Sequence, residues 1–437
     1  MRGRFFLCAL SCLLALVPAG CNTGQGVSNG STHGSLRAIN VIPNAGAALN
    51  FTFDNKSLIT GLGFESMTEY QTIDSGSRRI QVMLSGSSTD AIDTTLTFLA
   101  DNDYTYIAFG PVTAAGALVI NDSVTVDPGA GKFALRVING ASNNAFVDVY
   151  VTPPGVDLNS VAPSVAAVGY GTVSGFANID AGSMELRVTP TASKQVIYDS
   201  AAQTFDERAQ IEAVVYSRGS SSLVNVALLK IDDRGTGSIA DSTLARFKAV
   251  NGSSVGSPLN VFVDQDLALS NIPYAAASTY TTIAAGTRSL TVEATATPGA
   301  ALLSFAPTFA PATDSTITLT GAAGALTATV FDDANSPPKP GRARVRVVNS
   351  TVDVAALDVF INFSRQISGL AMNAASAGIE LDADPTAGTS YEFDFNVSGS
   401  SQTSLQLPAV TLQGGKLYSI YIVGPAAALA AVVVPDN

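Results

Sequence analysis

The sequence has few of the residues that enzymes most often use for chemistry. Its three cysteines, Cys8, Cys12 and Cys21, all lie within the first 21 residues, which excludes disulfides, cysteine-based zinc sites and thiol nucleophiles from the rest of the chain. The single histidine, His33, excludes a histidine-dependent triad and a site with several histidine ligands. We therefore predict a protein that is not an enzyme, with no catalytic residues, no cofactor and no metal.

Charge is also scarce. Charged residues make up 13% of the chain, the formal net charge is -12, and no run of lysine or arginine occurs. Nucleic acid is excluded as a partner because its phosphates require a basic surface. An acidic surface also resists anionic membranes, so attachment to a membrane must have another cause.

The composition favours strands over helices. Hydrophobic residues make up 46% of the 437 residues, and Val, Ile, Thr, Ala and Gly are prominent, which suits half-buried pleated surfaces. A single core stops growing at roughly 250 to 300 residues, so we expect three or four domains.

The N-terminus has the features of a secretory signal. A short basic stretch ends at Arg4 and an apolar stretch follows over residues 5–17. It ends in Pro18-Ala19-Gly20-Cys21, which resembles the lipobox of bacterial lipoproteins, although that motif usually has Leu where Pro18 stands. The alternative is an incidental cysteine at an ordinary cleavage site. We favour lipidation of Cys21 because a polar tether follows it directly.

The lipobox resemblance implies a location. It predicts an exported protein, lipid-anchored in the bacterial cell envelope, with the membrane as partner through the anchor. Asn22 after the cysteine implies delivery to the outer membrane, on its periplasmic or surface face. Residues 21–34, rich in Gly, Ser, Asn and Thr, form the expected flexible tether.

A series of landmarks recurs four times in the same order, which indicates an array of copied units. The first landmark ends in an asparagine, and these asparagines are 99, 112 and 98 residues apart: Leu36–Asn40, Leu135–Asn139, Phe247–Asn251 and Val345–Asn349. Eight or nine residues later, each copy has a segment that alternates with period two, as a strand with one buried face does: Leu49–Asp54, Val147–Thr152, Leu259–Asp264 and Leu357–Asn362.

Two further landmarks complete each copy. Gly76, Gly182 and Gly286 precede another alternating run, where a turn needs positive φ, and the fourth copy keeps only Ala387-Gly388. A strand pair then closes the unit. In the last copy, residues 417–434 could pass for a membrane span, but the repeat register favours two buried strands joined by a turn at Gly424-Pro425.

The predicted fold class is all-β, with four tandem immunoglobulin-like β-sandwich domains after a lipoprotein signal peptide and a short flexible tether. About seven short strands in roughly 100 residues suit this sandwich, without the Cys and Trp hallmarks of antibody domains. A seven-bladed propeller is the alternative and fits the period poorly. The expected boundaries are 1–20 for the signal, 21–34 for the tether, and 35–131, 132–240, 241–340 and 341–437 for the domains.

The succession of Leu135–Asn139, Val147–Val151, an Ala-Gly before alternating strands, and a strand such as Tyr104-Thr105-Tyr106 resembles the family known as domain of unknown function 4397 (DUF4397). The resemblance covers essentially all of the chain after the tether. It implies tandem domains in exported bacterial proteins, often behind a lipoprotein signal. Family members often have His in the first landmark, where this chain has Asn. The family carries no established activity, so the resemblance supports fold and location only.

Some motifs suggest chemistry only superficially. Residues 252–256 fit the G-x-S-x-G pattern, but no histidine follows them, and we expect an ordinary turn. The carboxylate pairs Asp232-Asp233, Asp332-Asp333 and Asp382/Asp384 lie in joints and loops, where we expect solvated residues in preference to calcium ligands or catalysts.

Three aromatic residues occupy an equivalent place on the polar face of the alternating strand: Tyr150, Phe262 and Phe360, with Thr52 in the first copy. Each is either covered by a loop or neighbouring domain or available to a ligand. We favour coverage. The alternative is a repeated shallow platform that stacks on sugar rings.

The leading hypothesis is a non-enzymatic cell-envelope lipoprotein, whose tandem β-domains act as a spacer and an interaction surface for an envelope protein or a glycan. The alternative is a polysaccharide-binding module, with hydrolysis less favoured. Both depend on four separate cores, and they predict no cleft where polar groups of different copies converge.

Overall fold

The computed structural model describes residues 32–43, 48–219, 221–231, 237–333, 338–339 and 341–436. Within these ranges the regular elements are β-strands and two short 3-10 turns, η1 (Val112–Ala114) and η2 (Leu158–Ser160). No helix in the described part is long and apolar enough to cross a bilayer. The all-β prediction is confirmed. The predicted signal peptide, Cys21 and nearly all of the tether lie outside the described residues.

Eight of the nine sheets form four pairs, and we call each pair a unit; the ninth sheet is formed by two short strands of unit 3, β25 and β28, whose bounds are given below. Unit 1 contains β1 (His33–Val41), β2 (Leu49–Phe53), β3 (Lys56–Leu62), β4 (Ser66–Met67), β5 (Gln71–Asp74), β6 (Gly76–Leu84), β7 (Asp90–Phe98), β8 (Asp103–Phe109) and β9 (Gly116–Asn121). Unit 2 contains β10 (Lys132–Asn139), β11 (Phe146–Thr152), β12 (Val165–Gly169), β13 (Thr172–Val173), β14 (Ala177–Asp180), β15 (Gly182–Pro190), β16 (Tyr198–Phe205), β17 (Gln210–Tyr216), β18 (Asn225–Lys230) and β19 (Ser238–Ala240).

Units 3 and 4 repeat this succession. Unit 3 contains β20 (Leu244–Ser253), β21 (Leu259–Val263), β22 (Asp266–Ile272), β23 (Ala276–Ala277), β24 (Thr281–Ala284), β25 (Gly286–Thr287), β26 (Leu290–Ala294), β27 (Ala301–Phe305), β28 (Thr308–Phe309), β29 (Asp314–Gly321) and β30 (Thr327–Asp332). Unit 4 contains β31 (Arg342–Thr351), β32 (Ala356–Ile361), β33 (Ser364–Ala371), β34 (Ala374–Ala375), β35 (Ile379–Asp382), β36 (Thr389–Val397), β37 (Thr403–Leu412), β38 (Leu417–Gly424) and β39 (Ala430–Pro435).

The two main sheets follow the same basic strand order in every unit. The sheet that holds the first strand, here called the front sheet, has the order β4-β1-β8-β9 in unit 1, and the back sheet has the order β3-β2-β6-β7. The first strand of each unit runs parallel to the next-to-last strand of the shared pattern: β1 with β8, β10 with β17, β20 with β29, and β31 with β38. The front sheet of unit 2 has an extra strand, β19, beyond β18.

Each sheet pair encloses its own apolar cluster, as expected for sandwich-like units. The buried residues of each of the four clusters come from a single unit. The predicted alternation is visible in β21, where Leu259, Val261 and Val263 are buried while Asn260 and Phe262 are partly exposed. The sandwich architecture is confirmed, and the exact domain boundaries stay a prediction.

The recurring asparagine closes the sandwich. The side-chain amides of Asn40, Asn139, Asn251 and Asn349 donate to carbonyl groups on the edge strand of the back sheet, at Leu62, Val168, Ile272 and Leu370. Their Oδ1 atoms accept the backbone N–H two residues later. Each asparagine therefore joins the two sheets, and its recurrence has a structural cause.

The turn predictions are also confirmed. Gly76, Gly182 and Gly286 have φ of 101°, 117° and 93°. Gly424, with φ of 89°, ends β38, and β39 returns antiparallel to it. The apolar C-terminal segment is therefore the predicted strand pair, with a turn at Gly424.

Candidate functional site

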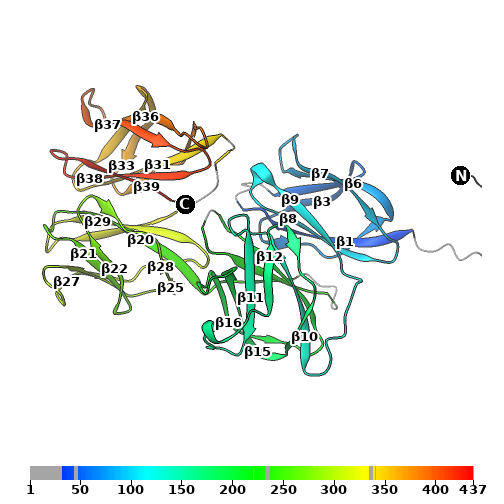
Figure 1. Ribbon diagram of the computed structural model, residues 1–437. Helices are drawn as coiled ribbons and strands as arrows, with labels where there is room; N and C mark the ends of the chain where they lie inside the picture. Colours follow the sequence, from blue (N-terminus) through cyan, green and yellow to red (C-terminus); the bar gives the residue numbers. More distant parts are fainter. Residues whose placement is uncertain are drawn as a thin grey trace, which may run out of the picture.

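The front sheets of neighbouring units pack against each other in pairs. Unit 1 and unit 2 share an apolar cluster, here called the 1–2 interface: Ile39, Val41, Ile107, Phe109, Ile120, Ile138, Val214, Tyr216, Ala227 and Leu229. Unit 3 and unit 4 share a second cluster, the 3–4 interface: Val250, Phe331, Val348, Tyr421, Val423 and Val432. Figure 1 shows the blue-to-cyan strands beside the teal-to-green ones, and the orange-to-red strands above the green-to-yellow ones. The central front-sheet strands are therefore buried on both faces.

A cation on the first strand of every unit lies at these interfaces: Arg37, Arg136, Lys248 and Arg346. Each stands three residues before the recurring asparagine. Its register partner on the parallel strand is Thr105, Glu212, Thr316 or Ser419. In units 1, 3 and 4 an aspartate follows the last strand: Asp122, Asp333 and Asp436. Ile231 occupies that place in unit 2.

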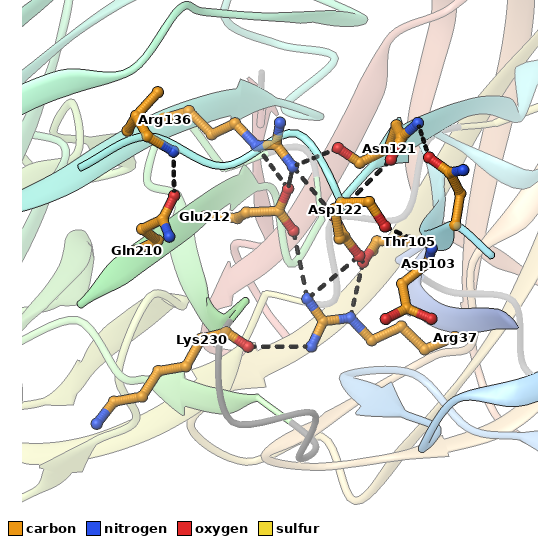
Figure 2. A network of polar contacts seen from close by, with 12 residues as sticks. Arg37, Asp103, Thr105, Asn121, Asp122, Arg136, Gln210, Glu212 and Lys230 are labelled. Carbon is orange, nitrogen blue, oxygen red and sulfur yellow. Dashed lines mark hydrogen bonds and ion pairs between the residues drawn. The ribbon is translucent and has the colours of Figure 1, made fainter. Parts of the chain in front are cut away.

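The ion pairs of the 1–2 interface are crossed between the units (Figure 2). Arg136 of unit 2 reaches Asp122 of unit 1 at 3.0 Å, and Arg37 of unit 1 reaches Glu212 of unit 2 at 3.5 Å. Within unit 1, Arg37 Nε donates to Thr105 Oγ1 at 2.7 Å, and the Thr105 hydroxyl donates to Asp122 at 2.5 Å. Two cations and two carboxylates are thus buried together, which satisfies charges that would be costly to bury singly.

Glu212 occupies the centre of this network. Its side chain is fully buried, with a hydrogen bond of 2.7 Å from Arg136 Nε. Burial and the neighbouring Asp122 raise its pKa to about 7, although the two arginines act in the opposite direction. The network therefore gains or loses a proton near neutral pH.

The 3–4 interface repeats the crossed arrangement. Lys248 of unit 3 pairs with Asp436 of unit 4, and Arg346 of unit 4 pairs with Asp333 of unit 3. The same internal hydroxyl bridge is present, because Ser419 donates to Asp436 at 2.5 Å and is itself bonded by Arg346 Nε at 2.7 Å. At both interfaces, the cation of each unit thus forms an ion pair with a carboxylate of the other unit.

Tyrosine rings cover the cations. The guanidinium of Arg37 lies 4.8 Å from the ring centre of Tyr70, and the ammonium of Lys248 lies 4.5 Å from that of Tyr280, both within cation–π range. The Tyr70 hydroxyl donates to Asp122 at 2.7 Å, and that of Tyr280 donates to the carboxylate of unit 3. Burial and the nearby carboxylate raise the pKa of both phenols, so they remain neutral donors.

A cleft of about 1030 Å³ lies where the four units meet. Lys248, Tyr280 and Asp436 line it beside the strands β23 and β39, and the side facing them is formed by loops of units 1 and 2: Pro111, Ser142, Asn143, Gly219 and Ser222. The cationic groups in its lining are paired, Lys248 with Asp436 and Arg246 with Asp314. The rest of the lining combines small apolar residues, such as Ala276 and Ala431, with hydroxyl and amide side chains, such as Ser278 and Asn143, and with strand edges. The expectation that polar groups of different copies do not converge is wrong.

The three candidate aromatics are placed differently from one another. Tyr150 is 1% exposed, and the ammonium of Lys194 lies 4.6 Å from its ring centre and 2.8 Å from its hydroxyl. Covered in this way, Tyr150 offers no open ring face to a sugar. Phe262 and Phe360 are partly exposed on the outer faces of their back sheets. The structure does not bring the three together.

The other sequence candidates are structural or lie outside the described residues. The G-x-S-x-G segment leaves β20 after Ser253, and its central serine, Ser254, donates through its hydroxyl to the carbonyl of Gly321 at 3.3 Å, so the segment is a structural connection between strands. The expectation of a solvated residue is wrong for Asp333, because its carboxylate is buried against Arg346. Asp382 is exposed as expected, and the pair at 232–233 is not described. No group of three or more potential metal ligands occurs among the described residues.

The interface cations were missed by sequence reasoning, although a signal exists. A single Arg or Lys in the middle of an apolar strand recurs in all four copies, three residues before the asparagine. Apolar neighbours on both sides of that cation indicate a strand buried on both faces, where a charge needs a partner.

Comparison with known families gives one clear match. A family model described as "Domain of unknown function (DUF4397)" matches residues 34–150, 245–360 and 343–437, which together span more than half of the chain. The first segment runs from unit 1 into β11, the second strand of unit 2. No curated protein matches the chain.

Solved structures resemble the chain only weakly, as three of them illustrate. Family 41 carbohydrate-binding modules from streptococcal virulence factors, described for alpha-glucan recognition, align with 10% identity and a TM-score of 0.17 over 44% of this chain and 96% of theirs. The Bacillus anthracis TIE protein aligns with 9% identity and a TM-score of 0.15 over 90% and 69%. A family 26 carbohydrate-binding module from Eubacterium rectale, in complex with maltoheptaose, aligns with 11% identity and a TM-score of 0.15 over 45% and 96%. Similarity at these TM-scores carries no argument about function.

Proposed function

The chain belongs to the DUF4397 family, and from that premise we propose that it is a non-catalytic spacer and interaction protein of the cell envelope, held at its membrane by a lipid on Cys21. One observation carries the spacer role: the front sheets are buried pairwise against each other with crossed ion pairs. A string of independent domains would leave these faces in water. Here they fix the orientation of neighbouring units, which a spacer requires.

The rigidity of the pairs is testable with spin labels. The sequence has no cysteine after residue 21, so a secreted Cys21→Ala chain takes labels only where cysteines are introduced. One label at exposed Ser87 in unit 1 and one at exposed Gln195 in unit 2 report their separation by pulsed electron resonance. We expect a single narrow distance distribution that broadens in Arg136→Ala. A broad distribution in the otherwise unchanged chain contradicts the spacer proposal.

The anchor has a separate test. Cells that express the protein are labelled with a radioactive fatty acid and fractionated. We expect label and membrane association in the wild type and loss of both in Cys21→Ala. Unlabelled wild-type protein refutes the anchor and leaves the rigidity result unaffected. Fractionation also separates the outer membrane, which the residue after Cys21 favours, from the inner membrane.

A second candidate function is glycan binding at the back sheet of unit 4. Phe360 is partly exposed there, with Asp394 opposite it on β36 and Arg365 opposite it on β33. An aromatic ring beside carboxylate and guanidinium groups suits a sugar, whose ring stacks while its hydroxyls form hydrogen bonds. A glycan array should show signal that Phe360→Ala removes, while Tyr150→Ala, at the covered position, leaves it unchanged. An array without signal removes this candidate.

A further inference from the structure

The edge of β39 presents unpaired backbone groups to the cleft. Among the described strands, β39 pairs with β38 alone, and the N–H of Asp436 donates to the carbonyl of Leu417 at 2.9 Å. In an antiparallel pair, the residues that bond to the neighbouring strand alternate with residues that point away from it. The register therefore turns the N–H and C=O groups of Ala431 and Val433 away from β38. Both residues line the cleft.

Unit 2 shows how the same edge is occupied elsewhere in this chain. Its equivalent of β39 is β18, because β17 and β38 are the strands parallel to the first strand. The outer edge of β18 is covered by β19, which pairs antiparallel with it, Val226 opposite Ala240 and Leu228 opposite Ser238. By register, Val226 and Leu228 correspond to Ala431 and Val433. The 1–2 pair thus has a strand where the 3–4 pair has the cleft.

The residues around β19 indicate what such a strand needs. Ile239, at its centre, lies opposite Ala227 and packs against the 1–2 interface. Gly237 lies against β4, since a Cβ there would be 2.8 Å from the sulfur of Met67. In the 3–4 pair, Val432 corresponds by register to Ala227, and Ala277 corresponds to Met67. Both line the cleft and belong to the apolar cluster between the units. The cleft is therefore continuous with an existing interface.

The other free edge of this pair, that of β30, borders a much smaller cavity. By register Val330 of β30 corresponds to Val433, and its N–H also points away from the neighbouring strand. The second cavity, of about 220 Å³, is lined by β30 only through Asp332. The β30 edge thus provides a matched control, because it has the same backbone chemistry and does not line the large cleft.

We propose that the edge of β39 binds an extended peptide segment of a partner polypeptide, which adds to the front sheet of unit 4 as β19 adds to that of unit 2. The alternating N–H and C=O groups recognise the backbone of an extended chain, and an aliphatic side chain opposite Val432 enters the apolar cluster. A long apolar edge left open to water is otherwise a liability for a folded protein. This inference names a partner class for the proposed interaction role.

The test uses the secreted Cys21→Ala chain and a fluorescein-labelled peptide with the sequence of residues 236–243, which contains β19. Fluorescence anisotropy measures binding to the unchanged chain, to Val433→Pro and to Val330→Pro. Proline at 433 removes the outward N–H and no bond to β38, as proline does at an edge position. We expect saturable binding that weakens about ten-fold in Val433→Pro and is unchanged in Val330→Pro.

Two further measurements separate the outcomes. Hydrogen exchange of the unchanged chain should show slower exchange at Ala431 and Val433 when peptide is added, which does not depend on any variant folding. A peptide with aspartate in place of Ile239 should bind at least about ten-fold more weakly. No saturable binding up to about 1 mM peptide, or protection confined to β18, overturns the proposal. Because the spin-label distances are measured without peptide, failure here leaves the spacer role untouched.

Discussion

Replacing Glu212 by glutamine is expected to remove the main pH dependence of stability between pH 5 and 8. Burial and the neighbouring Asp122 raise the pKa of Glu212 to about 7 from its ordinary value of 4.5. A carboxyl with a raised pKa in the folded state binds its proton more tightly there than in the unfolded chain. Its contribution to stability is therefore complete below about pH 4.5 and is lost as the pH rises through about 7.

The size of this effect follows from the pKa difference of about 2.5. Each pKa unit corresponds to about 1.4 kcal/mol, so the wild type should lose up to about 3 kcal/mol of unfolding free energy between pH 5 and 8 from this group. For a pair of units that unfolds together, the Tm changes by roughly 2 to 4 °C for each kcal/mol of unfolding free energy. The Tm of the wild type should therefore fall by up to about 10 °C between pH 5 and 8. Glutamine does not titrate, so the Tm of Glu212→Gln should stay nearly level.

Scanning calorimetry at pH 5, 6, 7 and 8 measures the difference between the two proteins. The single histidine, His33, is replaced by glutamine in both, so that it does not contribute. Burial also raises the pKa of Asp199, which lies outside the network. Asp199→Asn is therefore the control variant, because it removes a carboxyl with a raised pKa and leaves the network unchanged. If Glu212→Gln keeps the pH slope of the wild type, or if the wild-type Tm rises with pH in this window, the reasoning is refuted.

Three further changes test other parts of the fold by urea unfolding. Arg346→Met leaves Asp333 buried without its cation and should cost about 3 to 5 kcal/mol, whereas Lys230→Met, in an exposed pair, should cost less than about 1. Asn251→Ala leaves buried backbone groups without partners and should cost about 2 to 3 kcal/mol; a loss below about 0.5 would contradict its role between the sheets. Phe363→Gly should stabilise by about 1 kcal/mol, because Phe363 is exposed with φ of 65° in a tight turn, and destabilisation would indicate a contact for its ring.

Much of the fold could be predicted because it depends on local patterns. Period-two alternation marked β21 and its equivalents, and glycine at a fixed offset marked turns with positive φ, as Gly182 shows. The pairing of units could not be predicted in the same way. It depends on the outer face of the front sheet, and the landmark Leu135–Asn139 reads as one continuous apolar run with a single cation. Such a run signals burial on both faces without naming the partner.

The site was harder to predict because its members are far apart along the chain. Lys248 and its carboxylate partner Asp436 are 188 residues apart. An aspartate after a strand is also a common turn residue, and so Asp333 was expected to be solvated. The pairing becomes visible only when two units are placed face to face, since each cation is bound by the carboxylate of the other unit.

Unit 2 departs from the repeat in two ways that belong together. Where the other units have an aspartate after the last strand, it has Ile231, and its carboxylate stands instead at Glu212 on a central strand, within reach of both arginines. The end of β18 therefore carries no charge that needs an ionic partner. The edge of β18 is covered by β19. Unit 4 keeps Asp436 after its last strand, where it binds Lys248, and the edge of β39 borders the cleft. The position of the carboxylate and the covering of the strand edge therefore differ together between these two units. In unit 2 the chain's own β19 covers the edge of β18, and in unit 4 the edge of β39 is the one to which we propose that a partner peptide binds.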